Sequence, residues 1–175
     1  MKTKNTFRIP IGFAAGILYL FRADPTIWSF FAGASLMLAG EAIRFISAGT
    51  LIKFEGVTRT GIYAYSRNPL YLGSFIIGAG ACLIGRDIPF ALFYVIAFPL
   101  IYIRIIKREE QHLTERYGED YEHYIREVPL FWSGRFSIRK ILGASSPFLA
   151  VKNRELKTVL GIVAILAVMA SKIIF

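Results

Sequence analysis

The first residues in this chain that can do chemistry stand where an apolar stretch is about to begin. Residues 65–73 read YSRNPLYLG, and the apolar run continues to residue 84. Asn is favoured at a helix N-cap and Pro at the first helical position, so Asn68 and Pro69 predict a helix start. A helix start carries partial positive charge and free N–H groups, and Arg67 adds a cation beside them. This arrangement predicts a binding site for an anionic group.

A second charged stretch, KREE at residues 107–110, follows the next apolar run. The runs 69–84 and 88–106 are joined by a short turn, so we expect an antiparallel helical hairpin. Counting 1.5 Å per residue from the turn puts Asn68 level with about Arg104, and Glu109 about 7 to 8 Å further along. The two charged stretches therefore meet at one end of the hairpin. Glu109 and Glu110 are about 100° apart around a helix, so which of them faces inward stays open.

An anion site with a carboxylate opposite it suits a ligand that carries both a carboxylate and an amine. The amino-acid end of S-adenosylmethionine has these groups. The residues alone also allow a plain helix cap, with Arg67 reaching lipid phosphate and the glutamates solvated at a helix exit. Tyr63 and Tyr71 can frame a sulfonium through cation–π contacts or anchor helices at a membrane interface. Arg104 can orient an anionic substrate group or reach for lipid head groups.

The elements that must position these residues are apolar. Of the 175 residues, 55% are hydrophobic, too many for an ordinary soluble domain. Apolar runs recur at residues 9–21, 26–47, 69–84, 88–106 and 158–175. Each is near the short end of the length that crosses a bilayer, so whether the first spans fully stays open. We predict one all-α membrane domain over residues 1–175, a multi-pass transmembrane bundle of about five helices with 158–175 as an extra C-terminal membrane helix.

The charges favour one orientation of this bundle. Lys and Arg number 21 against 12 Asp and Glu, a net charge of +9. Basic residues gather before the first run, between the second and third, and between the fourth and fifth, whereas the other two turns are charge-balanced. Under the positive-inside rule we expect an integral membrane protein whose basic loops and candidate site face the cytoplasm. The charge favours contact with membrane lipids, and its scatter argues against nucleic-acid binding. The oligomeric state stays open.

Other residues are interpreted as structural. Glu41 and Arg44 lie three apart in the second run, and we expect them to pair with each other. The lone Cys82 and the two histidines, His112 and His123, are too few for a metal cluster, so no metal site is predicted. In the last run, small residues recur at every third position and predict close helix packing there: Gly161, Ala164, Ala167 and Ala170.

The segment after the fourth run has a helical pattern of its own. Apolar and aromatic residues recur there at helical spacing around Gly118: Leu113, Tyr117, Tyr121, Tyr124 and Val128. We predict that the fourth helix continues past the membrane and turns near Gly118. A short cytoplasmic amphipathic helix then follows, with its aromatic side chains in the head-group layer.

Two stretches together carry a family resemblance. GVTRTGIYAYSRNPLYLG at 56–73, followed by REEQHLTERYGEDYEHYIREVP at 108–129, resembles the isoprenylcysteine carboxyl methyltransferases and phospholipid N-methyltransferases. The resemblance covers about residues 40–132. It implies an integral-membrane methyltransferase that uses S-adenosylmethionine, with the cofactor motifs within residues 49–136. It also implies a lipid-like or amphiphilic acceptor that approaches from the bilayer and is methylated on a carboxylate or an amine.

The resemblance also implies which residues form the site. The cofactor-binding positions that it marks are Gly56, Val57, Tyr63, Arg67, Asn68, Pro69, Leu70, Tyr71 and Glu109. The prenylcysteine members hold a substrate-binding arginine four residues before that glutamate, where this chain has Ile105. Arg104, beside it, is our candidate catalytic residue for orienting the substrate.

Two other functions stay open. Sterol reductases share a related helical arrangement but bind a nicotinamide cofactor, whose phosphates call for a larger basic pocket than this short loop offers. A small transporter or a non-catalytic membrane scaffold would carry mid-membrane charges and repeated halves. We see no repeat, and the charges gather at one face, so the methyltransferase interpretation is favoured.

Overall fold

The chain folds as a bundle of helices. The computed structural model describes residues 8–52, 56–132, 134 and 137–174, and within these ranges it contains no strand. Its elements are α1 (Arg8–Arg22), α2 (Ile27–Thr50), the 3-10 helix η1 (Gly61–Ala64), α3 (Pro69–Gly85), α4 (Ile88–Tyr117), α5 (Glu119–Glu127), α6 (Ile138–Gly143), α7 (Pro147–Lys152) and α8 (Leu156–Ile174). The helices α2, α4 and α8 are long and apolar enough to cross a membrane, and α3 is a shorter apolar helix. The predicted all-α membrane bundle is confirmed.

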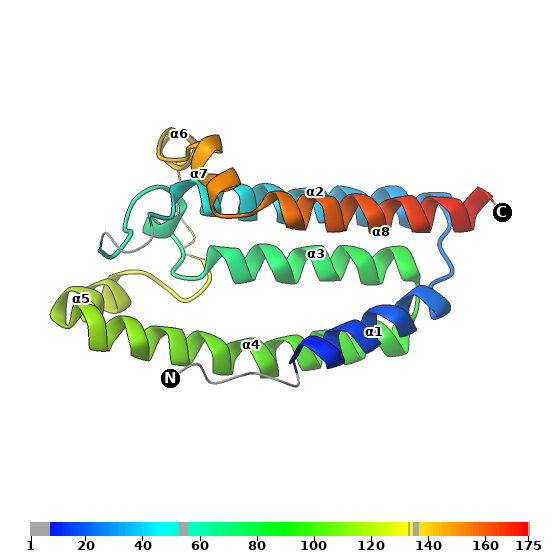
Figure 1. The fold of residues 1–175 in the computed structure, drawn as a ribbon, viewed down its shortest axis with the longest axis horizontal. Coiled ribbons are helices and arrows are strands. Elements are labelled where there is room, and N and C mark those ends of the chain that lie inside the picture. The colour runs from blue at the N-terminus through cyan, green and yellow to red at the C-terminus, as the bar shows by residue number, and fades with distance from the viewer. Residues whose placement is uncertain (1–7, 53–55, 133, 135–136, 175) are drawn as a thin grey trace.

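The helices lie in layers along one axis (Figure 1). α3 lies between α2 on one side and α4 on the other, and α8 runs beside α2. The short helices α5, α6 and α7 gather at the end of the bundle where α3 begins and α4 ends. The loop with η1 lies at the same end, so the residues singled out in the sequence come from neighbouring elements.

Glycines let α2 and α3 pack at very close range. A Cβ added at Gly40 would lie 2.7 Å from the carbonyl oxygen of Gly73, and one added at Gly80 would lie 2.6 Å from that of Gly33. Each helix thus offers two glycines seven residues apart, which is two helical turns on one face. This backbone-to-backbone contact sets the position of α3.

At the opposite end of the bundle, the turn between α1 and α2 contacts the turn between α3 and α4. Arg22 at the end of α1 forms an ion pair with Asp87 in the turn between α3 and α4, and Arg86 lies 3.8 Å from Asp24. The hydrogen bond from Arg22 is the main cause that lowers the pKa of the Asp87 carboxyl. Asp87 also caps α4, since its side chain accepts the backbone N–H of Phe90 at 3.0 Å. The charge balance of these turns in the sequence thus corresponds to paired charges.

The helix α8 is built into the bundle. Its Ile162 and Met169 are buried in one core with residues of α1, α2 and α3, and Lys172 donates to the carbonyl of Ala23 at 2.7 Å. The predicted close packing is wrong at Gly161, because among the described residues nothing lies within 4 Å of a Cβ placed on it. The larger side chains Ile162 and Met169 make the contact, whereas Gly161, Ala164 and Ala167 are exposed and Ala170 is half-buried.

The segment after α4 also differs from its prediction in one respect. α4 continues to Tyr117, the chain turns at Gly118 with a φ of 55°, and α5 follows, all as expected. However, the side chains of Tyr121 and Tyr124 do not face outward toward head groups, because they are buried against Val57 of the loop before η1. The aromatic residues of α5 therefore hold this loop in place.

Candidate functional site

The start of α3 meets the extended end of α4. The Tyr71 hydroxyl donates to Oε1 of Glu109 at 2.8 Å, and Nη1 of Arg67 donates to Oε1 of Glu110 at 2.7 Å. The prediction that the two charged stretches lie next to each other is therefore confirmed. Both glutamates take part, although their helical angles suggested that only one would.

The two glutamates differ in whether their carboxylates can bind a further hydrogen-bond donor. Glu110 and Arg67 are largely buried and bond to each other, with side chains 18% and 12% exposed. Glu109 is exposed and accepts from Tyr71. Its carboxylate can therefore take a further donor, such as an ammonium group, while the charge of Glu110 is compensated by Arg67.

Asn68 stands at the N-cap of α3 and Pro69 at its first position, as predicted, but the Asn68 side chain makes no capping hydrogen bond. Its backbone, with φ of −131° and ψ of 52°, departs from the extended geometry that directs a side chain back over the first turn. The backbone N–H groups of Tyr71 and Leu72 both donate to the Asn68 carbonyl. Fewer free N–H groups remain in this turn than the sequence suggested.

Two buried donors beside this helix start have no hydrogen-bond partner among the described residues. They are Nδ2 of Asn68 and Nε of Arg67. Burying an N–H group without an acceptor costs about 1–3 kcal/mol. An anionic group bound here would supply acceptors, so these residues fit the carboxylate of a zwitterionic ligand.

The loop before α3 is tied to the segment after α4. The Tyr124 hydroxyl donates to the carbonyl of Tyr63 at 2.7 Å, and the N–H of Arg67 donates to that of Pro129 at 3.0 Å. Gly56 has a φ of 116°, a conformation that favours glycine, and Val57 packs on α5. The loop and the segment thus form one wall around the helix start.

Burial in this wall raises the pKa values of two tyrosines, Tyr63 and Tyr121. Tyr63 is 7% exposed and packs with Ile62 and Ile141 of α6, so its ring is part of a core and does not anchor the chain at a membrane surface. Burial raises the pKa of the Tyr63 phenol and raises that of Tyr121 to about 12. Both phenols therefore stay neutral and can act as hydrogen-bond donors.

Arg104 is not brought to this meeting point. The ring of Tyr102 lies 5.3 Å from that of Tyr71, so Tyr102 marks the side of α4 that faces α3. Two residues further is about 200° around a helix, which places Arg104 on the opposite side, where it is exposed. Ile105 is half-buried beside it.

Sequence reasoning missed two contributors to the site. Tyr102 packs on Tyr71, and it precedes Glu109 by seven residues, a spacing that puts both on one helix face. That spacing was a usable signal. Ser66, fully buried, accepts the N–H of Asn68 through its hydroxyl at 3.3 Å, a contact within a loop that no periodicity indicates.

Comparison with known proteins gives a family match. The family model described as Phospholipid methyltransferase matches residues 28–120. The chain is similar to Protein-S-isoprenylcysteine O-methyltransferase of Schizosaccharomyces pombe, 33% identical over 97 residues, which cover 55% of this chain and 41% of that protein.

Two further relatives share shorter regions. A Delta(14)-sterol reductase of Candida albicans is 39% identical over 70 residues, 39% of this chain and 16% of that protein. The nickel-cobalt-cadmium resistance protein NccN of Alcaligenes xylosoxydans xylosoxydans is 37% identical over 82 residues, 46% of this chain and 37% of that protein. This chain thus spans less than half the length of each relative. No solved structure matches it at a significant level.

Proposed function

The chain belongs to the phospholipid methyltransferase family, whose model spans more than half of it, and on this premise we propose that it is a membrane methyltransferase. Its donor is S-adenosylmethionine and its acceptor is lipid-like or amphiphilic. One observation carries the proposal: within the matched region, an exposed carboxylate on α4 lies beside a helix start whose buried side-chain donors have no partner among the described residues.

The residues divide the binding of the amino-acid end of the donor between them. Glu109 holds the ammonium group, and Nε of Arg67 and Nδ2 of Asn68 hold the carboxylate. Glu110 accepts a hydrogen bond from Nη1 of Arg67 and so keeps this arginine in place. Nε of Arg67 is then left to bind the ligand. Opposite charges on the two sides of the site select a zwitterion over a simple anion.

When bound, S-adenosylmethionine supplies a methyl group on a positively charged sulfur. The chain contributes alignment and exclusion of water, the main sources of catalysis for a displacement of this kind. The Tyr71 hydroxyl contacts Glu109, and the Tyr71 ring packs on that of Tyr102, so these rings can face a cation through their π systems. Val57, which packs on α5, and Gly56 beside it would cover the site from the loop side.

The acceptor enters from the bilayer, and the site faces the cytoplasm. The apolar surface of α4 supports the first part, since side chains such as Leu92, Ile96 and Leu100 are exposed along it. Positive charge at the site end of the bundle supports the second. Ile105 stands where the prenylcysteine enzymes hold a substrate-binding arginine, and Arg104 lies on the far side of α4. We therefore name no residue for the polar group of the acceptor.

The direct test is binding to the detergent-purified chain. We expect saturable binding of S-adenosylmethionine, and transfer of label from methyl-labelled donor to a component of a membrane lipid extract. Identification of the labelled lipid then names the acceptor. Failure to bind the donor in detergent and also in lipid nanodiscs would reject the function.

A reductase is the second candidate, since sterol reductases of three organisms match 70 to 78 residues of this chain. Each match covers at most 16% of the reductase. The same binding measurement on the detergent-purified chain, made with NADPH in place of S-adenosylmethionine, separates the two functions. Binding of NADPH without binding of S-adenosylmethionine would favour the reductase.

A further inference from the structure

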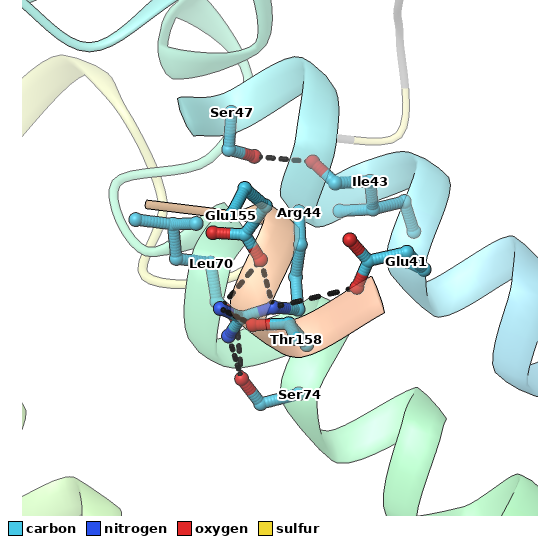
Figure 2. A network of polar contacts seen from close by, with 8 residues as sticks. All are labelled: Glu41, Ile43, Arg44, Ser47, Leu70, Ser74, Glu155 and Thr158. Atoms are coloured by element: carbon cyan, nitrogen blue, oxygen red, sulfur yellow. Dashed lines mark hydrogen bonds and ion pairs between the residues drawn. The ribbon is translucent and has the colours of Figure 1, made fainter. Parts of the chain in front are cut away.

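Arg44 lies where α2, α3 and α8 meet, on the side of α3 that faces α2 and α8 (Figure 2). Its Nε donates to Oε1 of Glu155 at 2.7 Å, and its Nη2 lies 2.6 Å from the same oxygen. Nη2 also donates to the hydroxyl of Thr158 at 3.2 Å. The side chains of Arg44 and Glu155 are 19% and 6% exposed. The predicted pairing of Arg44 with Glu41 is secondary, because those charged atoms are 3.8 Å apart.

The other side of the guanidinium holds the beginning of α3. Nη1 of Arg44 donates to the carbonyl of Leu70 at 3.4 Å and to the hydroxyl of Ser74. Ser74 in turn donates to the Leu70 carbonyl at 2.9 Å. Leu70 belongs to the first turn of α3, between Asn68 and Tyr71. Arg44 therefore holds the turn that also carries Asn68 and Tyr71 of the candidate donor site.

The position of Glu155 is itself set by the turn between α7 and α8. Nδ2 of Asn153 donates to the carbonyls of Ala48 and Leu51 at 2.8 and 3.0 Å, and so caps the end of α2. Arg154 follows with a φ of 67°, and Glu155 stands directly before α8. This turn is docked on α2, so the carboxylate of Glu155 is held at a fixed place beside Arg44.

Glu41 provides an internal comparison. It approaches the same guanidinium, but both of its carboxylate oxygens are buried without a hydrogen-bond partner in the described chain. Arg44 thus has two neighbouring carboxylates, of which Glu155 accepts hydrogen bonds and Glu41 does not. A charged pair without hydrogen bonds at this distance orients its partner weakly.

We propose that Glu155 is a positioning residue for the donor site: through Arg44 it sets the first turn of α3, and α8 is thereby part of the functional unit. This inference rests on the proposed function for the meaning of the site. Glu155 lies outside the matched region 28–120 and 111 residues from Arg44 in sequence. Within the described part of the chain, its carboxylate bonds to Arg44 and to none of Glu109, Arg67 and Asn68, so its effect passes through Arg44 and Leu70.

The test compares Glu155→Gln with two matched controls. Glu41→Gln makes the same chemical change beside the same arginine, and Lys172→Met loosens the far end of α8 without touching Arg44. For each variant in nanodiscs we would measure donor affinity, thermal stability and amide hydrogen exchange at Tyr71 and Leu72 without ligand. We expect Glu155→Gln to weaken donor binding about tenfold, as loss of a charged hydrogen bond would, and to speed exchange in this turn. We expect Glu41→Gln to stay near wild type in both.

Lys172→Met separates positioning from simple attachment of α8. It should lower thermal stability while donor affinity and exchange at the start of α3 stay unchanged. Glu155→Asp keeps the charge and should restore part of the affinity. The inference would be overturned if Glu155→Gln showed the same amide exchange and donor affinity as the wild type. It would also be overturned if Lys172→Met changed exchange and affinity as much as Glu155→Gln does. The exchange measurement needs no ligand, so a wild-type chain that fails to bind the donor rejects the proposed function separately.

Discussion

Single side chains at the start of α3 divide into those that build the site and those that are left for a ligand. Arg67 does both, because its Nη1 is bonded to Glu110 while its Nε has no partner in the described chain. Asn68 holds the helix start through its carbonyl, and its buried side-chain nitrogen has no hydrogen-bond partner among the described residues. Glu109 is bonded to Tyr71 but exposed. The contribution of these side chains to stability and their contribution to ligand binding can therefore be tested separately.

We predict that Glu109→Gln weakens binding of S-adenosylmethionine by one to two orders of magnitude and leaves the fold intact. The variant removes the charge that pairs with the ammonium group, and a charged hydrogen bond is worth about 1.5–3 kcal/mol. Titration calorimetry on the purified variant measures the change. The control is Glu115→Gln on the same helix, whose partners are the exposed Gln111 and His112. Equal affinities in the two variants would remove Glu109 from the site.

For Asn68→Ala we predict weaker donor binding, by less than in Glu109→Gln, with unchanged thermal stability. Removing an N-cap side chain ordinarily costs about 0.5–2 kcal/mol, but this one makes no capping bond. Asp87→Ala is the contrast, since Asp87 caps α4 and pairs with Arg22. Melting of both variants in one detergent shows the difference. A clear loss of stability in Asn68→Ala would contradict the geometry of this turn.

At the scale of elements, the close pairing of α2 and α3 is the contact that places the site. The glycines at positions 33, 40, 73 and 80 bring the two backbones together, and Arg44 then reaches the first turn of α3. Tyr71 lies in the first turn of α3, so the placement of α3 on α2 helps to set where the Tyr71 hydroxyl meets Glu109. Packing between these two helices therefore helps to determine the geometry of the proposed donor site.

We predict that Gly80→Ala destabilises the bundle by about 1–3 kcal/mol, the usual cost of overpacking, because its Cβ would lie 2.6 Å from the Gly33 carbonyl oxygen. Gly161→Ala is the matched control. A Cβ there has nothing within 4 Å, so stability should be unchanged or slightly higher, as helix propensity favours Ala. Thermal unfolding in detergent compares them. Equal melting temperatures would argue against the close contact.

The sequence predicted these elements and their meeting better than it predicted their partners. Helix starts and turns are local, so Pro69, Gly118 and the hairpin that brings Tyr71 to Glu109 could be read from it. The pairing of Arg44 with Glu155 could not, because the nearer Glu41 offered the same charge three residues away. The inward turn of Tyr121 and Tyr124 was also missed, since an aromatic stripe looks the same whether it faces head groups or a loop.

Over the whole molecule, the two ends of the bundle differ in how their charges are used. At one end, the charges pair across two turns, Arg22 with Asp87 and Arg86 with Asp24. At the other end, the exposed charged residues of the described stretch 138–157 are all basic: Arg139, Lys140, Lys152, Arg154 and Lys157. Basic segments resist transfer across a membrane, whereas paired and balanced turns cross more readily. This asymmetry supports our proposal that the donor site faces the cytoplasm.

We predict that a cysteine at position 24 reacts with a membrane-impermeant maleimide in intact cells, and that one at position 119 reacts only after permeabilisation. Cys82 is buried and the only cysteine, so Cys82→Ala gives a background for Asp24→Cys and Glu119→Cys. Asp24 and Glu119 are both exposed, at opposite ends of the bundle. Exposure is thus matched, and a difference in labelling reports the side of the membrane. The reverse pattern would place the donor site outside, where cells hold no supply of S-adenosylmethionine, and would contradict the proposed function as well as the orientation.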